Sequence, residues 1–208
     1  TPDKMSLIGQ FGVGFYASFM VSLNVKVVSR KAGDSQTWVW ESDGKTGFTV
    51  REATTDEAKT LLADRGTAIN LKIDDDSSEY LLMEKLRLVI VEYSDHISTP
   101  IFLGRGDGTD DDNGAAKIQV NKASALWMRP KSEITEDQYS DFYHHIGHGM
   151  DKPMMTSHWH AEGKIEYTAL LFVPTLRPWD LYDPSRKNAA RLYVKRVFIT
   201  DDCAGLMY

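Results

Sequence analysis

The chain has 208 residues, of which 42% are hydrophobic and 26% are charged, and its formal net charge is −6 at pH 7. This composition indicates a globular protein of one large or two small domains, and the acidic balance argues against general binding of nucleic acid through phosphates. The single cysteine excludes a disulfide within the chain and fits a reducing compartment, and no apolar run approaches the roughly 20 residues of a membrane-spanning helix.

The first feature in chain order is a glycine-rich segment with the spacing G-x-x-G-x-G, formed by Gly9, Gly12 and Gly14. Glycine permits positive φ and a close approach of the backbone to a ligand, and unpaired amides at the start of a helix attract phosphate. An apolar run follows, so we expect a helix over residues 10–21 behind a phosphate-binding loop. The spacing matches neither the dinucleotide fingerprint nor the GxxxxGK[ST] loop. On the residues alone, a tightly packed glycine turn is therefore an equal alternative.

Four segments then predict β-strands. Residues 23–27 and 69–73 alternate apolar with polar side chains, which is the two-residue period of a strand. Residues 36–42 and 47–51 lie on either side of an Asp43-Gly44 turn signal. We expect these four strands to form one sheet that is mainly antiparallel.

The second half of the chain begins with helical spacing. Apolar residues within 82–93 recur at intervals of three and four, which predicts an amphipathic helix. Residues 104–115 are acidic, rich in glycine and poor in apolar residues, so they are expected to be a solvated linker; a long surface loop within one domain is the alternative. A second helix is expected to begin at 134–137, followed by strands over 165–173 and 192–199. This order of elements predicts the α+β class.

Several of these segments resemble the 90-kDa heat-shock chaperone family. The segment LIGQFGVGFY, residues 7–16, resembles the ATP lid of the family, and residues 65–71 resemble its Gly-Thr strand. Residues 93–97 resemble the helix that ends its nucleotide domain, and residues 121–127 resemble the opening of its middle domain. The resemblance covers nearly the whole chain in order, and the short linker is similar to that of the bacterial branch. The other matching segments are residues 40–42, 178–181 and 192–202.

The resemblance implies that the chain is an internal part of a longer protein. Residues 1–103 would be the C-terminal part of an ATP-binding domain, an α/β sandwich of the type shared by gyrases, chaperones, histidine kinases and mismatch-repair proteins. Residues 104–115 would be the linker, and residues 116–208 the N-terminal part of a client-binding middle domain. In isolation, residues 1–103 are expected to fold poorly.

The function that the resemblance implies is that of an ATP-dependent molecular chaperone of the cytoplasm, active in the stress response. It would bind and remodel unfolded client proteins through nucleotide-driven closure of the lid. The implied cofactors are ATP and Mg²⁺, with the Mg²⁺ ligand outside this chain. The whole protein is expected to form a homodimer through a C-terminal domain that also lies outside it. No nucleic acid or membrane partner is implied.

The resemblance assigns nucleotide contacts to the lid and to one strand residue. Amides of the lid would lie over the triphosphate, with the amide of Phe15 close to the ligand. The hydroxyl of Thr67 can read the adenine edge directly or through water, although its spacing alone favours an ordinary strand residue. The catalytic groups of the family lie outside this chain, so no catalytic or metal-binding residue is assigned and the chain alone is expected to lack ATP hydrolysis. The assigned residues are Gly9, Gln10, Phe11, Gly12, Val13, Gly14, Phe15 and Thr67.

Two tryptophans and a group of histidines complete the candidate residues. Trp127 and Trp179 are assigned to client or interdomain contacts, because a large ring beside flexible apolar residues suits weak apolar binding; the alternative is that each ring fills the core. Five histidines fall between residues 144 and 160. A zinc or nickel site there is geometrically conceivable, but no cysteine or carboxylate stands at metal spacing, so a surface cluster that responds to acid pH is favoured.

Two other classes of function stay open. One is another ATPase of the same superfamily, of the topoisomerase, mismatch-repair or sensor-kinase type. The segments after residue 116 and the acidic charge weigh against the DNA enzymes. The other is a non-enzymatic interaction module in which the glycine loop is only structural. An upstream helix with glutamate and asparagine, followed by Asp-x-Gly-x-Gly, would distinguish the ATPase from such a module.

Overall fold

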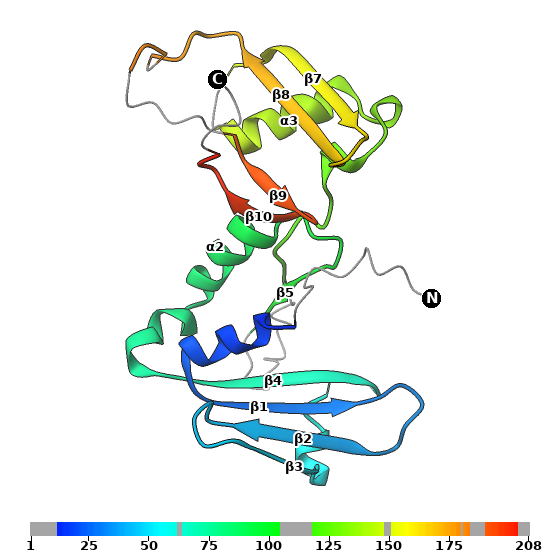
Figure 1. Ribbon diagram of the computed structural model, residues 1–208, viewed down its shortest axis with the longest axis vertical. Coiled ribbons are helices and arrows are strands. Elements are labelled where there is room, and N and C mark those ends of the chain that lie inside the picture. The colour runs from blue at the N-terminus through cyan, green and yellow to red at the C-terminus, as the bar shows by residue number, and fades with distance from the viewer. Residues whose placement is uncertain are drawn as a thin grey trace, which may run out of the picture. The chain divides into compact units, whose positions relative to one another are not determined.

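A computed structural model of the chain combines helices with antiparallel strands (Figure 1). The predicted α+β class is therefore confirmed. The contacts divide the chain into two compact units, residues 1–88 and 89–208. Gly9, Gln10 and Phe11, together with most of the expected linker, lie outside the described residues. The structure describes residues 12–61, 64–104, 118–147, 151–179, 181–183 and 190–203.

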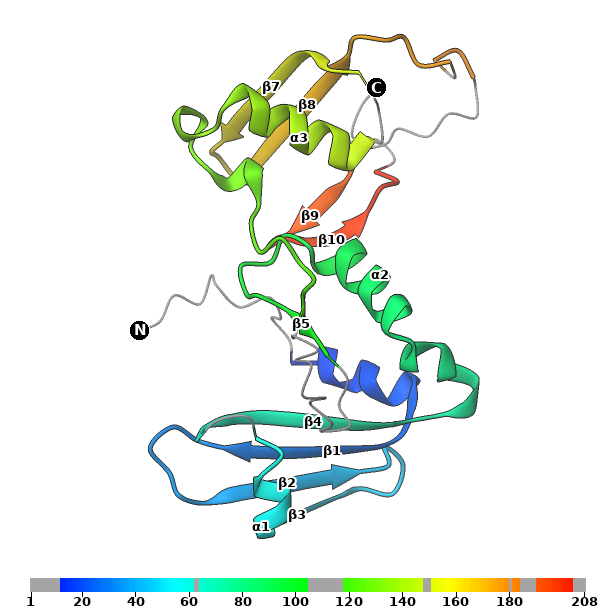
Figure 2. The ribbon, with the colours of Figure 1, turned by 180° about the vertical axis from the view of Figure 1, so that it is seen from behind.

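The first unit contains a four-stranded antiparallel sheet with the strand order β3-β2-β1-β4 (Figure 2). All four predicted strands are present. The fully buried side chains of the sheet are Val25, Val28 and Val39, on the two central strands. The strands are β1 Ser22–Arg30, β2 Thr37–Ser42, β3 Phe48–Glu52 and β4 Gly66–Ile73.

Strand register assigns the side chains of this sheet to two faces. Val27 stands opposite Trp40 on β2 and Ile69 on β4, and Trp40 stands opposite Val50 on β3. These side chains share one face, which we call the apolar face. Ile69 and Val50 are 53% and 57% exposed on it. The alternation in the sequence identifies this face but does not tell how much of it another element covers.

The short helix η2 (Gly14–Met20) contacts the apolar face. The ring centroids of Phe15 and Phe19 lie 5.5 and 6.5 Å from that of Trp40, with the rings edge to face. A helix was predicted over residues 10–21, and its described part is a 3₁₀ helix. The Ser18 hydroxyl donates to the carbonyl of Phe15 and the Ser22 hydroxyl to that of Ser18. Such local bonds compete with the α-helical pattern.

The opposite face of the sheet carries an ion-pair cluster centred on Glu57. Helix α1 (Thr55–Ala58) begins with a capping box, in which Thr54 and Glu57 each accept a backbone N–H of the other. The Glu57 carboxylate also accepts two bonds from Arg51, at 2.7 and 2.6 Å, and one from Lys26. The bonds from Arg51 and then Lys26 hold the pKa of Glu57 well below its usual range.

We expect Glu57→Gln to destabilise the first unit at neutral pH. The variant should also lose less stability than the wild type as the pH falls. Folding depresses the pKa of Glu57, so its stabilising effect is fully present above the unfolded-state value of about 4.3 and is lost as the pH falls toward the folded value. The difference in urea midpoint between wild type and variant, followed through NMR signals of Trp38 and Trp40, should narrow from about pH 6 to about pH 2.5. Asp56→Asn is the matched control, because that carboxylate is 91% exposed on the same helix. A difference that is constant over this pH range would contradict the prediction.

Two helical segments follow the sheet. The carboxylate of Asp74 caps the 3₁₀ helix η3 (Asp75–Leu81) by accepting the N–H of Ser77. Helix α2 (Met83–Ser94) confirms the amphipathic helix predicted over residues 82–93. The division between the two compact units falls inside α2, after Leu88. This division follows the density of contacts and does not test where a domain ends. The predicted domain boundaries at 103 and 116 therefore stay a prediction.

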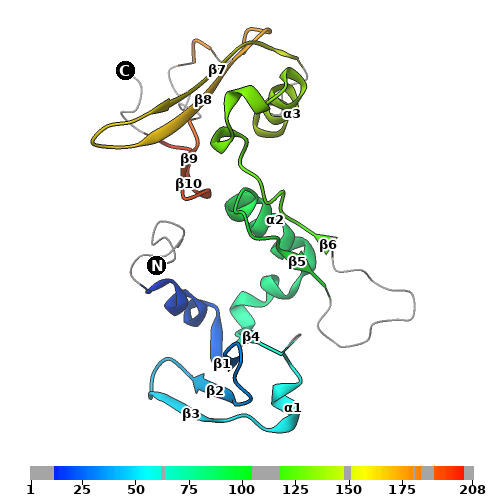
Figure 3. The same ribbon diagram turned by 90° about the vertical axis from the view of Figure 1, so that its right-hand side faces the viewer.

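The second unit packs helix α3 (Glu136–Gly147) against the antiparallel pair β7 (Pro153–Ala161) and β8 (Tyr167–Pro174) (Figure 3). Tyr139 and Tyr143 are buried on α3. Strand β8 was predicted, whereas β7 was not, because its sequence PMMTSHWHA does not alternate regularly. In the part of the chain that the structure describes, no helix has both the length and the apolar character to cross a bilayer.

The single strand predicted over residues 192–199 is wrong. The structure has a hairpin, β9 (Leu192–Val194) and β10 (Val197–Thr200), with Lys195 and Arg196 at its turn. Both turn residues have positive φ, 49° and 69°, which two-residue hairpin turns of type I′ require. Lysine and arginine are not the usual Asn-Gly signal for this turn, so no turn signal interrupts the apolar residues on either side of it.

Candidate functional site

The described part of the glycine segment is an open turn that leads into η2. Gly12 has a φ of +68°, which residues with a side chain rarely adopt, and a Cβ added there would meet no atom within 4 Å. Val13 precedes η2 and provides no side-chain cap for its amides. Val13 is also 62% exposed. The backbone from Gly12 to Phe15 can therefore be approached by a ligand.

Thr67 lies on the apolar face of the sheet, the face that η2 contacts. It stands opposite Ser29 on β1, and its Oγ1 lies 2.9 Å from the Ser29 Oγ. Thr67 is exposed. Thr67 and the ring of Phe15 thus lie on the same face of the sheet, and among the described residues no hydrogen bond joins Thr67 to the segment from Gly12 to Phe15.

In the second unit, a buried network centred on Asn121 joins two of the segments on which the family resemblance rests. Asn121 is 3% exposed. Its Oδ1 accepts the N–H of Ile101 at 2.8 Å, and its Nδ2 donates to the carbonyl of Thr99 at 2.9 Å. Longer bonds of 3.4 Å reach the carbonyls of Ser94 and Ile97. One side chain thus closes the turn that follows α2.

The two sides of the expected linker are also paired with each other. Strand β5 (Phe102–Leu103) pairs with β6 (Ile118–Gln119). The Oδ1 of Asp95 accepts the N–H of Lys122 at 2.8 Å, and its carbonyl accepts the N–H of Ala123 at 3.1 Å. Residues before and after the linker therefore form one hydrogen-bonded element within the second unit.

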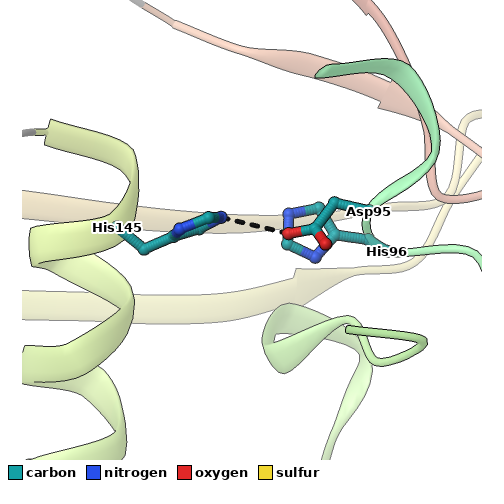
Figure 4. Close-up of side chains that lie close together, drawn as sticks. All are labelled: Asp95, His96 and His145. Atoms are coloured by element: carbon teal, nitrogen blue, oxygen red, sulfur yellow. Dashed lines mark hydrogen bonds and ion pairs between the residues drawn. The ribbon is translucent and has the colours of Figure 1, made fainter. Parts of the chain in front are cut away.

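Next to this element, the side chains of Asp95, His96 and His145 converge (Figure 4). The Nε2 of His145 lies 3.1 Å from the Oδ2 of Asp95. The Nδ1 of His96 lies 3.0 Å from the carbonyl of Ser124, and it carries the proton because a carbonyl can only accept. One nitrogen or oxygen from each of the three residues lies within 4.8 Å of the other two.

Burial controls the protonation of the two histidines. It lowers the pKa of His96 and of His145, and repulsion from Lys122 adds to the effect on His145. The carboxylate of Asp95 acts in the opposite direction on both, but burial dominates. Burial therefore favours the neutral form of both imidazoles. No contiguous sequence motif marks this triad, because His96 follows Asp95 directly but His145 lies 50 positions away.

Trp127, one of the two tryptophans assigned to client or interdomain contacts, is half-buried. It lies in the 3₁₀ helix η4 (Leu126–Met128), and its ring centroid is 4.7 Å from those of His96 and Tyr193. Its carbonyl is 3.0 Å from the Nε2 of His158. This geometry favours the core-filling alternative for Trp127, and a client contact there stays a prediction.

Trp179 differs from Trp127, because it is 95% exposed. It follows β8 in a segment where Leu176, Leu181 and Tyr182 are also exposed. We call these four residues the Trp179 patch. Its role in client contact stays a prediction.

The histidines between residues 144 and 160 do not form one site within the described residues. His158 is buried between the hydroxyl of Tyr139, at 2.8 Å, and the carbonyl of Trp127. His160 is exposed and lies near Thr168 on β8. His148 lies outside the described residues. Of the histidines in this group that the structure describes, His145 alone takes part in the triad with Asp95 and His96.

Comparison with known proteins agrees with the resemblance. Residues 111–208 match the family model described as Hsp90 protein. The chain is 48% identical to the Chaperone protein HtpG of Rhodospirillum rubrum and 49% identical to that of Paramagnetospirillum magneticum, in each case over 203 residues and 98% of this chain. It is 47% identical to the Chaperone protein HtpG of Rickettsia canadensis over 205 residues, 99% of this chain. It spans 30%, 30% and 31% of the lengths of these relatives.

The matched region is 98% of this chain and therefore extends across both compact units. The family model independently covers the second half of the chain. The chain belongs to the Hsp90 protein family.

Proposed function

We propose that the chain is part of an ATP-dependent molecular chaperone of the cytoplasm, which binds unfolded client proteins and remodels them through nucleotide-driven lid closure. The observation that carries the proposal is 48% identity over 98% of this chain to a protein named Chaperone protein HtpG. Because the chain spans about 30% of that relative, the activity is proposed for a polypeptide extended to the relative's length. The extended polypeptide would be a homodimer, as the family resemblance implies.

In this proposal the glycine segment covers the triphosphate with main-chain amides. Left-handed Gly12 turns the chain, and the amides of Gly14 and Phe15, which have no side-chain cap, are directed to the nucleotide. Thr67 hydrogen-bonds near the adenine. Its exposed hydroxyl, already within reach of Ser29 on the same face, supports this role. Gly9, Gln10, Phe11 and Val13 complete the lid.

The rest of the machinery would come from the extended polypeptide. Mg²⁺ fits ATP chemistry by neutralising phosphate charge, and the resemblance places its ligand outside this chain. Lid closure would change the population of client-binding conformations. The Trp179 patch is the proposed client contact on this chain, because an exposed ring among exposed apolar side chains suits weak and varied binding.

A pair of glycine substitutions tests the lid role. Gly12 and Gly33 have similar positive φ, 68° and 78°, and a Cβ added to either would meet open space. Each change to alanine therefore costs about 1–2 kcal/mol of backbone strain. In the extended polypeptide we expect Gly12→Ala to weaken ATP-analogue binding by about 5- to 30-fold. The reason is that the positive φ at residue 12 is required when the lid covers the nucleotide, so the substitution destabilises the bound state.

Gly33→Ala is the matched control and should leave the affinity unchanged while lowering stability by a similar amount. Thr67→Val should weaken binding as well. Equal affinities for Gly12→Ala and Gly33→Ala, measured by calorimetric titration, would overturn the lid role. The name of the relatives favours a chaperone over the topoisomerase, mismatch-repair and kinase alternatives.

A further inference from the structure

We infer that Asp95, His96 and His145 form a binding site for a divalent transition-metal ion, with Zn²⁺ as the physiological candidate. The side chains come from the turn after α2 and from the last turn of α3, and in Figure 4 they point toward one another. One ligand atom from each lies within 4.8 Å of the other two. Two imidazole nitrogens and one carboxylate oxygen are a donor set that Zn²⁺ and its neighbours in the first transition row accept.

The ring of His96 is held in the manner of a metal ligand. Its Nδ1–H donates to the carbonyl of Ser124, which leaves the lone pair of Nε2 for a cation. Contacts with Trp127 and Tyr193, at centroid distances of 4.7 and 5.5 Å, restrict rotation of the ring. Histidines that bind metals commonly donate their second nitrogen to a carbonyl in this way, which fixes the tautomer and makes the ligating nitrogen more basic.

The other two ligands are also prepared for a cation. The Oδ1 of Asp95 is held by the N–H of Lys122, and its Oδ2 is directed to the Nε2 of His145. Metal binding replaces this last hydrogen bond, because the neutral imidazole of His145 then carries its proton on Nδ1. Asp95 is 5% exposed. Water solvates this buried carboxylate poorly, so a bound cation would stabilise its negative charge.

The geometry requires only a small adjustment. Ligands at about 2.1 Å from a tetrahedral ion are about 3.4 Å apart, so separations of up to 4.8 Å must shorten by at most about 1.4 Å. The side chain of His145 is 30% exposed near the end of α3, where a rotamer change can supply this shift.

Two positive charges oppose the binding. Lys122 and Arg191 both lower the pKa of His145 by repulsion, and the same repulsion acts on a bound cation. The affinity is therefore expected to rise when the charge of Lys122 is removed. The test therefore includes a variant that is expected to raise the metal affinity as well as variants that are expected to lower it.

Cobalt titration of the folded 208-residue chain tests the site, because Co²⁺ in a four-coordinate site of nitrogen and oxygen ligands absorbs visible light much more strongly than hydrated Co²⁺ does. We expect one equivalent to bind. Asp95→Asn and His145→Gln should each weaken binding by about tenfold or more, and Lys122→Gln should tighten it. The glutamine amide that replaces the imidazole in His145→Gln can still donate to Asp95, so this variant should keep the fold, which near-ultraviolet circular dichroism checks.

His160→Gln is the matched control, since His160 is an exposed histidine on β7, outside the triad. It should change the affinity less than about twofold. Visible absorption no stronger than that of hydrated Co²⁺, in the folded chain, would overturn the inference. So would equal weakening by His160→Gln and His145→Gln, because that result would indicate scattered surface binding.

Discussion

Replacing Asn121 with alanine is expected to lower the free energy of unfolding of the second unit by about 2–4 kcal/mol. The side chain is 3% exposed, and its two short bonds satisfy the N–H of Ile101 and the carbonyl of Thr99. Alanine removes both of these part-buried bonds, and a polar group left without a partner in the interior costs about 1–3 kcal/mol. Urea unfolding, followed by circular dichroism and by hydrogen exchange at Ile101, measures the effect.

Two further variants sharpen the prediction for Asn121. Asn121→Asp keeps an acceptor for Ile101 but sets a carboxylate against the carbonyls of Thr99 and its neighbours, so it should destabilise at least as much. Asn70→Ala is the control, because Asn70 is an exposed strand residue on β4; it should cost less than about 0.5 kcal/mol. A similarly small cost for Asn121→Ala would show that the network does not hold the turn after α2.

Replacing His158 with leucine is expected to cost about 2–4 kcal/mol. The Nε2–H of His158 donates to the carbonyl of Trp127, so Nδ1 accepts the hydroxyl proton of Tyr139. His158 is 6% exposed and Tyr139 is 7% exposed. Leucine leaves the hydroxyl and the carbonyl without their partner in the interior, and the gain in apolar burial offsets only part of that loss. Chemical denaturation provides the measurement.

A double-mutant cycle separates this pairing from packing. Tyr139→Phe removes the hydroxyl that His158→Leu leaves unpaired, so the double variant should be more stable than the sum of the single changes by about 1–2 kcal/mol. His160→Leu on the same strand is the control and should cost about 0.5 kcal/mol or less. Strict additivity of the two single changes would contradict the hydrogen bond between His158 and Tyr139.

The elements that could be predicted are those whose pattern is local. The strands around Val27 and Ile69 and the helix that carries Tyr139 follow from periodicity over about ten residues or fewer, because burial of one face imposes that period. The hairpin at Lys195 and Arg196 could not be predicted, because nothing in these two side chains signals positive φ. Strand β7 was missed because tertiary packing, more than alternation, determines it.

The candidate sites divide in the same way. The glycine lid and Thr67 each lie in a short segment that resembles the family, so their roles could be proposed from that resemblance. The triad could not, because Asp95 and His145 come together only when the turn after α2 packs near α3. Composition also could not separate Trp127 from Trp179, since burial of a tryptophan depends on which neighbours the fold supplies.

Hydrogen exchange of the extended polypeptide, with and without an ATP analogue, tests the central claim most directly. If the lid amides bind the triphosphate, exchange at residues 12–15 should slow when the analogue binds, and exchange in the turn around Gly33 should not change. Unchanged exchange at residues 12–15, in a polypeptide that calorimetry shows to have bound the analogue, would contradict the account.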